Sequence, residues 1–442
     1  MGANIEALIF LFGGFLILLA VGFPLSFALG GLSVLSILIF WGNPAILNML
    51  VGAVSTLAQN PTFSAAPMFI FMGVLLEKSG IADSMFDSMY IVMGRIRGGL
   101  AIATVIICTM LSATTGVIAA SITIMTMLAL PAMMKYKYNF NLAAGSVMAT
   151  GGLGQLLPPS VIMIVFAGQA QMSVGRMFAG GIGPGLLMSL LFIIYIVIRT
   201  SINPNLGPPI AKEDAAGYSG SHKLGLALKS VVPTIFLIFL VIGSILGGMA
   251  TPTEAASIGS VGALLLVIIN KRFSLKILME ACFKTTITMG VIFTIIATAS
   301  MFSHVFLAFR GGALVYDLIT GLPFGRWGIL AVILLLVLVL GFLIDSYGLV
   351  MIGVPIFMPI IAELGFDPLW FAVVFITMMV ISMISPPFSY AAFYVKGAMR
   401  EDVNIMKLYN ATWAYLAMYL IGVILLIIFP EIITFIPNLI FG

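Results

Sequence analysis

A proline pair interrupts apolar sequence in Gly151-Gly152-Leu153-Gly154-Gln155-Leu156-Leu157-Pro158-Pro159-Ser160, and again in Ser382-Met383-Ile384-Ser385-Pro386-Pro387-Phe388-Ser389. The second pair follows the first after 228 residues, and Pro24 and Pro131 recur at the same spacing as Pro252 and Pro359. Because proline removes a backbone donor and breaks or kinks a helix, this shared spacing predicts two copies of one membrane-embedded fold. Duplicated folds with interrupted helices near the middle of the membrane are typical of secondary transporters.

The composition is that of a polytopic membrane protein. Of 442 residues, 62% are hydrophobic and 8% are charged, whereas soluble domains carry about 25% charged residues. The mean hydropathy is +1.23, so the lipid bilayer is an expected partner. The net charge of +4 is spread over many loops, which does not favour a nucleic-acid partner. Cys108 and Cys282 lie in apolar runs without metal-ligand spacing, so we expect buried thiols and no metal centre of that kind.

A polar stretch divides the chain into two halves. Residues 200–228 contain three prolines and a Gly/Ser cluster, a composition typical of a linker. We therefore expect an all-α chain with a first repeat at 1–199, a cytoplasmic linker at 200–228 and a second repeat at 229–442. The expected elements are a hairpin at about 98–134 and a broken helix at about 139–169, then a hairpin at about 327–362 and a broken helix at about 368–395.

Basic residues predict that the two halves are inverted in the membrane, because Lys and Arg of short loops concentrate on the cytoplasmic side. The first hairpin has basic residues at both ends, namely Arg95, Arg97, Lys135 and Lys137. The second hairpin has one basic residue before it and two acids after it: Arg326, Glu363 and Asp367. The loop Trp41–Asn48 lacks basic residues, whereas its counterpart carries Lys271, Arg272 and Lys276. Both hairpins are thus expected to be re-entrant, entering from opposite sides, with both termini periplasmic.

The hairpin tips carry the polar side chains that such a fold can use. We place the first tip at Ser112–Gly116 and the second at Ile344–Gly348, both at membrane depth, where protein, water, ion or substrate must cover the backbone. A broken helix exposes carbonyl oxygens that suit a hard cation and amides that suit an anion. Asp345 is the only carboxylate in either tip, and a charge at the bilayer centre costs about 2.5–3.5 kcal/mol on insertion scales. Sodium or a proton is therefore its expected partner.

Several of these features also have structural interpretations. A single Gly-Pro break is common as a simple kink, and Asp345 could instead form a structural salt bridge. Glu254, in Thr251-Pro252-Thr253-Glu254, favours a helix cap over a functional role. Arg310 is interpreted as an interfacial anchor or partner contact, and His304 as an ordinary helix residue.

Four stretches together resemble the large membrane subunit of tripartite ATP-independent periplasmic (TRAP) transporters. They are Gly-x-Pro-x-x-Phe-Ala-x-Gly at 22–30, Ser-Ala-Thr-Thr-Gly at 112–116, Gly-Gly-x-Gly-Gln-x-x-Pro-Pro-Ser at 151–160 and Thr-Pro-Thr-Glu-Ala-Ala at 251–256. The resemblance covers nearly the whole chain. The sequence is more distantly similar to divalent anion:sodium symporters, which share the inverted repeat with two re-entrant hairpins.

The resemblance implies a sodium-coupled symporter for a small organic anion in the bacterial inner membrane, working as an elevator. It implies a periplasmic substrate-binding protein and a small four-helix membrane subunit as partners, the latter expected as a separate chain. No cofactor other than sodium ions is expected. The implied cation ligands are Ser112, Thr114, Thr115, Gly116, Gly151, Gly152, Gln155, Asp345, Ser346, Ser382 and Ser385. Ser160 and Ser389 are the implied substrate contacts.

Other functions compete with this interpretation. A self-sufficient sodium/anion symporter would use the same core without a binding protein. An enzyme is disfavoured, because the chain has no Gly-x-Ser-x-Gly elbow with a partnered histidine and Asp345 lacks a second membrane aspartate. A channel is disfavoured because the chain lacks a four-fold filter repeat. The sequence leaves open which anion is carried: dicarboxylate, sialic acid, sulfonate, sugar acid or keto acid.

Overall fold

The computed structural model describes residues 4–41, 47–209, 220–399 and 403–442, and every regular element in these ranges is a helix. In the first half the elements are α1 (Ile5–Ala20), α2 (Leu25–Phe40), α3 (Leu47–Gln59), η2 (Pro61–Ser64), α4 (Ala65–Lys78), α5 (Ile81–Met93), α6 (Gly99–Thr115), α7 (Ile118–Lys135), α8 (Phe140–Gly152), η3 (Leu153–Gln155), α9 (Val161–Ala170), α10 (Val174–Ile202) and η4 (Pro204–Leu206). Those labelled η are short 3₁₀ helices.

The second half contains longer helices. They are α12 (Gly220–Leu246), α13 (Pro252–Ile269), α14 (Leu275–Ala308), α15 (Gly311–Thr320), α16 (Arg326–Leu343), α17 (Ser346–Glu363), α18 (Pro368–Ile384), α19 (Tyr390–Ala398), α20 (Ile405–Ile428) and α21 (Glu431–Phe441). Eight described helices are long and apolar enough to cross a membrane, or nine if the bent pair Pro61–Lys78 and Ile81–Met93 forms one span. The expected all-α polytopic class is confirmed.

Helix bounds repeat at the spacing of the proline pairs. Helix α17 begins and ends 228 residues after α7, and α18 begins 228 residues after α8. One difference is that the single long helix α14 occupies the place of α3, η2 and α4. The break in the first half follows from its sequence, because Asn60 caps η2 and Pro61, at the first position, has no N–H to continue the preceding helix.

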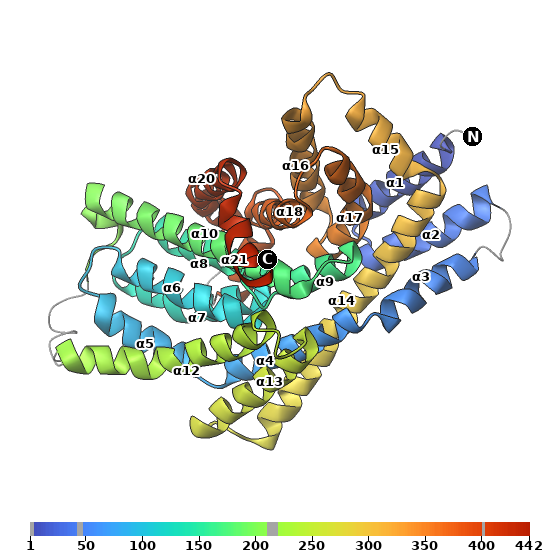
Figure 1. Ribbon diagram of the computed structural model, residues 1–442. Coiled ribbons are helices and arrows are strands. Elements are labelled where there is room, and N and C mark those ends of the chain that lie inside the picture. The colour runs from blue at the N-terminus through green and yellow to red at the C-terminus, as the bar shows by residue number, and fades with distance from the viewer. Residues whose placement is uncertain (1–3, 42–46, 210–219, 400–402) are drawn as a thin grey trace.

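The packing divides the helices into two groups. Helix α9 packs on α17 of the other half, and α19 packs on α7 in the same crossed manner, so that the hairpins and broken helices interlock (Figure 1). Outside this group, α4 packs on α13 and the long helix α14 runs along α2, α3 and α4 (Figure 1). The second part of each broken helix, α9 or α19, therefore packs on the hairpin of the opposite half, and α8 also packs on α20 across the halves.

Two expected boundaries are wrong. The hairpin tips are shorter than expected, because α6 continues through Thr115 and α17 already begins at Ser346. The first turn consists of Gly116 and Val117, and Gly116 adopts a left-handed conformation with φ of +61° that only glycine adopts freely. The expected linker is also too long, since helix begins at Gly220, in a stretch rich in the helix formers Leu, Ala and Lys.

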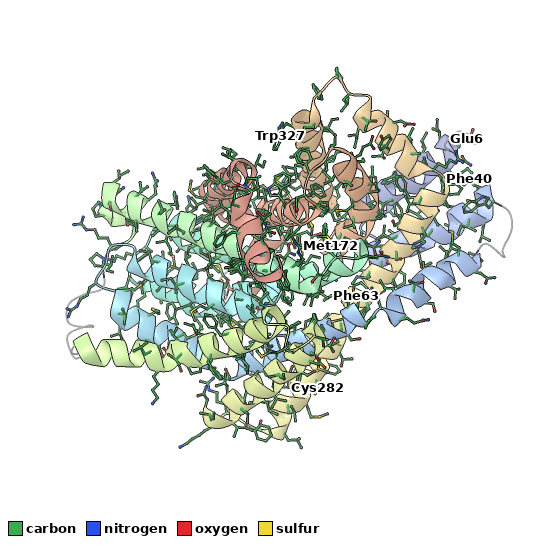
Figure 2. All side chains as sticks on the ribbon, viewed as in Figure 1. Glu6, Phe40, Phe63, Met172, Cys282 and Trp327 are labelled. Atoms are coloured by element: carbon green, nitrogen blue, oxygen red, sulfur yellow. The ribbon has the colours of Figure 1, made fainter. Side chains whose placement is uncertain are left out.

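Some expectations fall partly on residues outside the described ranges. These are the centre of the linker, at 210–219, and most of the loop Trp41–Asn48, at 42–46. The two cysteines differ from each other. Cys108 is buried as expected, but Cys282 is exposed on α14, so the expectation of two buried thiols is wrong for it (Figure 2). Helix α14 is lined by other helices along only part of its surface, which leaves this side chain uncovered.

Candidate functional site

Both helix breaks are held by serines that act as caps. Ser160 begins α9, where its hydroxyl donates to the Gln155 carbonyl at 2.9 Å and accepts from the Met163 amide at 3.5 Å. Ser389 begins α19 and accepts from the Ala392 amide at 3.3 Å. The Pro158–Pro159 and Pro386–Pro387 peptide bonds are both cis. The two serines singled out as substrate contacts are thus fully buried and occupied with helix capping.

A cavity of about 90 Å³ lies where the two hairpin tips meet the two breaks. Both halves of the chain contribute to it. Its lining residues are Gly116, Val117, Ile118, Ala119, Gln155 and Ile162 from the first half, with Asp345, Ser346, Tyr347, Met383 and Tyr394 from the second. The structure therefore brings Gly116, Gln155, Asp345 and Ser346, four of the expected cation ligands, to one cavity.

Gln155 connects the two halves inside this cavity. Its Nε2 donates to Ser346 Oγ at 2.8 Å and approaches the Met383 sulfur at 3.3 Å. Met383 is the residue 228 positions after Gln155, so the two equivalent positions of the repeat face each other. Among the described residues, Gln155 Oε1 is one of four buried side-chain oxygens or nitrogens without a hydrogen-bond partner. An unpartnered buried oxygen costs about 1–3 kcal/mol, a cost that a bound cation would remove.

Asp345 supplies the charge of the cavity. It caps α17, and its Oδ1 accepts from the Tyr347 amide at 2.8 Å. None of the three ion pairs in the described part of the chain includes Asp345. Tyr390 and Tyr394 of α19 lie close enough to interact with it electrostatically, and neither carries a positive charge. A carboxylate, an amide oxygen and a hydroxyl make an all-oxygen donor set, which suits a hard cation such as sodium.

The other expected cation ligands do not line this cavity. The side-chain hydroxyls point elsewhere: Ser112 approaches the Thr150 carbonyl at 3.5 Å, Thr114 bonds Leu111 at 2.8 Å, Thr115 bonds Ser121 at 3.1 Å, Ser382 bonds Met379 at 2.7 Å and Ser385 bonds Ile381 at 2.7 Å. Gly151 and Gly152 serve close packing, since a Cβ at either position would overlap Ile122 or Val380. All seven residues lie around the tips and breaks without forming one donor set.

Sequence reasoning missed seven lining residues of the cavity: Val117, Ile118, Ala119, Ile162, Tyr347, Met383 and Tyr394. The repeat spacing could have identified Met383, because it is the counterpart of Gln155. Tyr347 was within the quoted tip but was given no role. No signal in the sequence singled out Ile162 or Tyr394, which reach the cavity from the helices that follow the breaks.

The remaining candidates have local roles. Glu254 completes a capping box, since its Oε2 accepts from the amide and the hydroxyl of Thr251 at 2.8 Å each. Arg310 begins α15 in a left-handed conformation. The Nδ1 atom of His304 lies 2.8 Å from the Ser300 carbonyl in its own helix. In the described ranges no three His, Cys, Asp or Glu side chains gather as a metal site.

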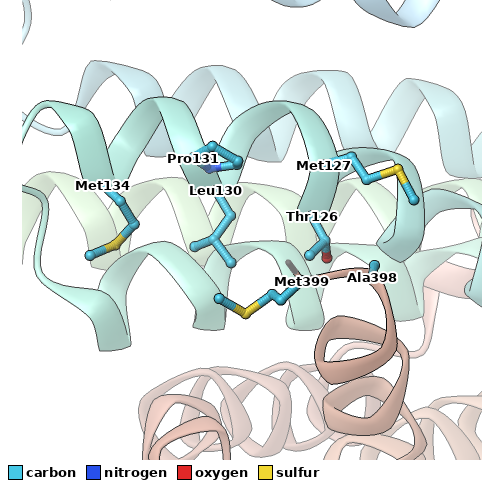
Figure 3. Close-up of a pocket in the computed structure, with 7 residues that line it drawn as sticks. All are labelled: Thr126, Met127, Leu130, Pro131, Met134, Ala398 and Met399. Carbon is cyan, nitrogen blue, oxygen red and sulfur yellow. The ribbon is translucent and has the colours of Figure 1, made fainter. Parts of the chain in front are cut away.

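A larger cavity, of about 600 Å³, lies between α7 and the end of α19 (Figure 3). Its lining is almost entirely apolar and consists of Thr126, Met127, Leu130, Pro131, Met134, Ala398 and Met399. Thr126 supplies its only side-chain hydroxyl. This donor set cannot hold an ion, so the smaller cavity at the tips is the stronger candidate for a binding site.

Comparison with known proteins places this geometry in context. Residues 12–432 match the family described as "Tripartite ATP-independent periplasmic transporter, DctM component". The C4-dicarboxylate TRAP transporter large permease protein DctM of Vibrio cholerae is 29% identical, with 96% of each chain covered. The ectoine TRAP transporter large permease protein TeaC of Halomonas elongata is 26% identical over 96% of this chain and 97% of that protein. In fold, the chain is similar to the Alcanivorax borkumensis YdaH transporter, with a TM-score of 0.63 and 17% sequence identity. The similarity covers 96% of this chain and 98% of that transporter chain.

Proposed function

Because the chain belongs to the DctM component family of TRAP transporters, we propose that it is the large membrane subunit of a sodium-coupled symporter that imports a small organic anion across the bacterial inner membrane. The permease names of the relatives support a role in transport. The cavity at the hairpin tips supports the binding of a coupling ion. We propose both termini to be periplasmic.

One observation carries the sodium coupling. The carboxylate of Asp345 and the unpartnered Gln155 Oε1 line one cavity, and no basic side chain lines it with them. A buried carboxylate with no basic partner is unfavourable, so it favours binding a cation. Asp345, Gln155 and Ser346 are the side chains that would hold sodium. Two sodium ions per monoanion would leave one net positive charge moving inward, worth about 2.3 kcal/mol per 100 mV.

The elevator proposal is supported by the packing. The hairpins and broken helices interlock through the α9–α17 and α7–α19 contacts, whereas α2, α3, α4, α13 and α14 pack mainly with one another. Two groups with dense internal packing can slide as bodies, because packed cores are bistable rather than continuously deformable. We propose that the interlocked group moves and that the second group stays fixed in the membrane. We also propose that the two halves of the chain are inverted relative to each other in the membrane.

The substrate and partners follow from the family. The two named relatives are described as transporters of chemically different solutes, C4-dicarboxylates and ectoine. Their sequence identities to this chain are 29% and 26%, so sequence identity does not select one solute for this chain. We propose a small carboxylate-bearing solute, delivered by a periplasmic binding protein, and a small membrane subunit that braces the fixed group. Ser160 and Ser389 would approach it only if their capping bonds opened.

The test is uptake into liposomes that contain this chain and its small subunit, with an inward sodium gradient. A panel of radiolabelled succinate, pyruvate, gluconate, N-acetylneuraminate, isethionate and ectoine is offered with and without the cognate binding protein. Uptake that requires both sodium and the binding protein is expected. Uptake that needs sodium alone would favour a self-sufficient symporter, and uptake indifferent to sodium would overturn the coupling.

A further inference from the structure

A further cavity, of about 220 Å³, lies on the other side of the start of α7 from the 90 Å³ cavity at the hairpin tips. The cavity at the tips is called the first cavity below, and the 220 Å³ cavity the second. It lies between α4, α7 and α14, and its lining residues are Ile70, Gly73, Val74, Glu77, Thr115, Val117, Ala119, Ala120, Thr123, Lys284 and Thr288. Val117 and Ala119 line both cavities, so they are neighbours across one thin wall. A molecule in the second cavity would therefore lie next to the proposed sodium site.

Lys284 gives the second cavity a positive charge. Its Nζ contacts both carboxylate oxygens of Glu77, at 2.7 and 2.9 Å. The Lys284 side chain is 47% exposed, whereas that of Glu77 is 21% exposed. At a rise of 1.5 Å per residue, Lys284 lies about 13 Å along α14, after Lys276 and Glu280 and before a stretch without Asp, Glu, Lys or Arg that runs to the end of the helix. A cation at this depth requires a partner, and Glu77 supplies it.

The lining of the two cavities together contains one basic side chain, Lys284, and two acidic ones, Asp345 and Glu77. A carboxylate solute beside Asp345 would be repelled by that carboxylate, and no basic side chain lines the first cavity to offset the repulsion. In the second cavity it would find an ammonium group and three threonine hydroxyls, those of Thr115, Thr123 and Thr288. The chemistry of an anion site is thus present next to the chemistry of a cation site.

We propose that Lys284, on the group proposed to stay fixed, is the counter-charge for the carboxylate of the transported solute at one end of the movement, and that the solute there replaces Glu77 as the ion-pair partner of Lys284. This proposal rests on the proposed function for the anionic nature of the solute. The exchange leaves the Lys284 ammonium with one carboxylate partner throughout, while the displaced Glu77 carboxylate, whose side chain is 21% exposed, turns toward solvent. Glu77 holds Lys284 paired between transport events, so that the ammonium group is never left uncompensated in apolar surroundings.

A simple structural brace is the competing explanation, and the chain offers a matched control for it. The Lys78–Glu280 pair, at 3.0 Å, joins the same helices α4 and α14, but neither residue lines the second cavity. A brace predicts similar effects from loss of either pair. The anion site predicts weaker binding from loss of Lys284 and no effect from loss of the Lys78–Glu280 pair. It also predicts that removing the Glu77 charge strengthens binding, because a competing carboxylate disappears.

The experiment is thermal unfolding of the purified full chain in sodium chloride, titrated with the sodium salts of succinate, pyruvate, gluconate, N-acetylneuraminate and isethionate. At least one salt is expected to stabilise the wild type. Lys284→Met is expected to weaken its apparent affinity tenfold or more, with Lys284→Arg retaining most of it. Glu77→Gln is expected to strengthen it severalfold, and Glu280→Gln to match the wild type.

Three results would overturn the inference. In the first, none of the five salts stabilises the wild type. In the second, Lys284→Met binds the salt as tightly as the wild type does. In the third, Glu77→Gln, Lys284→Met and Glu280→Gln all weaken binding equally. If Lys284→Met does not fold, the comparison of Glu77→Gln, expected to bind more tightly, with Glu280→Gln, expected to bind as the wild type does, still decides the question. Sodium chloride should stabilise Lys284→Met and wild type alike, so loss of this anion site is distinguishable from failure of the sodium coupling.

Discussion

Gln155 Nε2 donates a hydrogen bond of 2.8 Å to Ser346 Oγ, although 191 residues separate the two in the chain. The bond joins the break of the first half to the hairpin tip of the second. It leaves the other amide atom, Oε1, without a partner in a cavity that Asp345 also lines. This arrangement supports our proposal that the coupling cation binds between the halves rather than within either one.

Gln155→Met should weaken sodium binding without disrupting the fold. Methionine is the residue at the equivalent position of the second half, Met383, so the site accepts its size. The substitution removes one oxygen ligand, worth about 1.5–3 kcal/mol toward a charged group, and the sodium concentration for half-maximal uptake should rise about ten- to a hundredfold. Ser112→Ala, outside the cavity, should leave this value unchanged, and equal effects of both substitutions would contradict the assignment.

Gly116→Ala should destabilise the protein. Gly116 has φ of +61°, and a Cβ there would overlap the carbonyl oxygen of Pro159, so the hairpin tip would have to move from the break. Forcing a side chain into such a conformation costs of the order of 1–3 kcal/mol. The measurement is thermal unfolding of the purified chain. Gly13→Ala in α1, where a Cβ meets nothing within 4 Å, is the matched control and should unfold at the wild-type temperature or above.

Gly73→Ala should slow transport while sparing sodium binding. Gly73 of α4 lies against the hairpin, and a Cβ there would come within 2.8 Å of Thr115 Cα, a backbone atom that cannot rotate away. The contact lies between the group proposed to move and the group proposed to stay fixed. The maximal uptake rate should fall with an unchanged sodium requirement. Gly243→Ala in α12 is the control, because a Cβ at Gly243 meets nothing within 4 Å, and it should transport normally. If Gly243→Ala also lowers the uptake rate, the loss reflects a general folding defect.

Glu254→Ala should lower thermal stability without changing transport per folded molecule. The side chain accepts two bonds from Thr251 in the capping box of α13, a structural role. Glu254→Gln can still accept these bonds and should retain most of the stability. If Glu254→Gln folds normally but loses uptake, the glutamate charge has a functional role that the capping box does not explain.

Much of the architecture could be predicted from the sequence. The proline spacing located both breaks, and the apolar runs located the helices, because these signals are local. The family resemblance is confirmed by the match over residues 12–432. The inversion of the halves, the membrane orientation and the elevator motion stay predictions, since they concern the chain relative to a membrane.

The donor set of the site could be predicted only in part. We expected all polar tip residues to converge, but Ser112, Thr114 and Thr115 lie on helix α6, where successive side chains turn by about 100° and face different neighbours. The contacts Gln155–Ser346 and Lys284–Glu77 join distant segments, and no local pattern encodes such pairs. Asp345 was identified because a carboxylate at membrane depth is costly without a partner.

Sodium binding by Asp345→Asn decides whether the cation site lies between the hairpin tips. The measurement is equilibrium binding of radioactive sodium to the purified chain, compared among wild type, Asp345→Asn and Asp317→Asn, an exposed aspartate of α15 outside the cavity. The account predicts saturable binding in wild type and Asp317→Asn, and affinity weaker by on the order of tenfold or more in Asp345→Asn. Asp345→Asn that binds sodium with wild-type affinity would contradict a cation site between the hairpin tips.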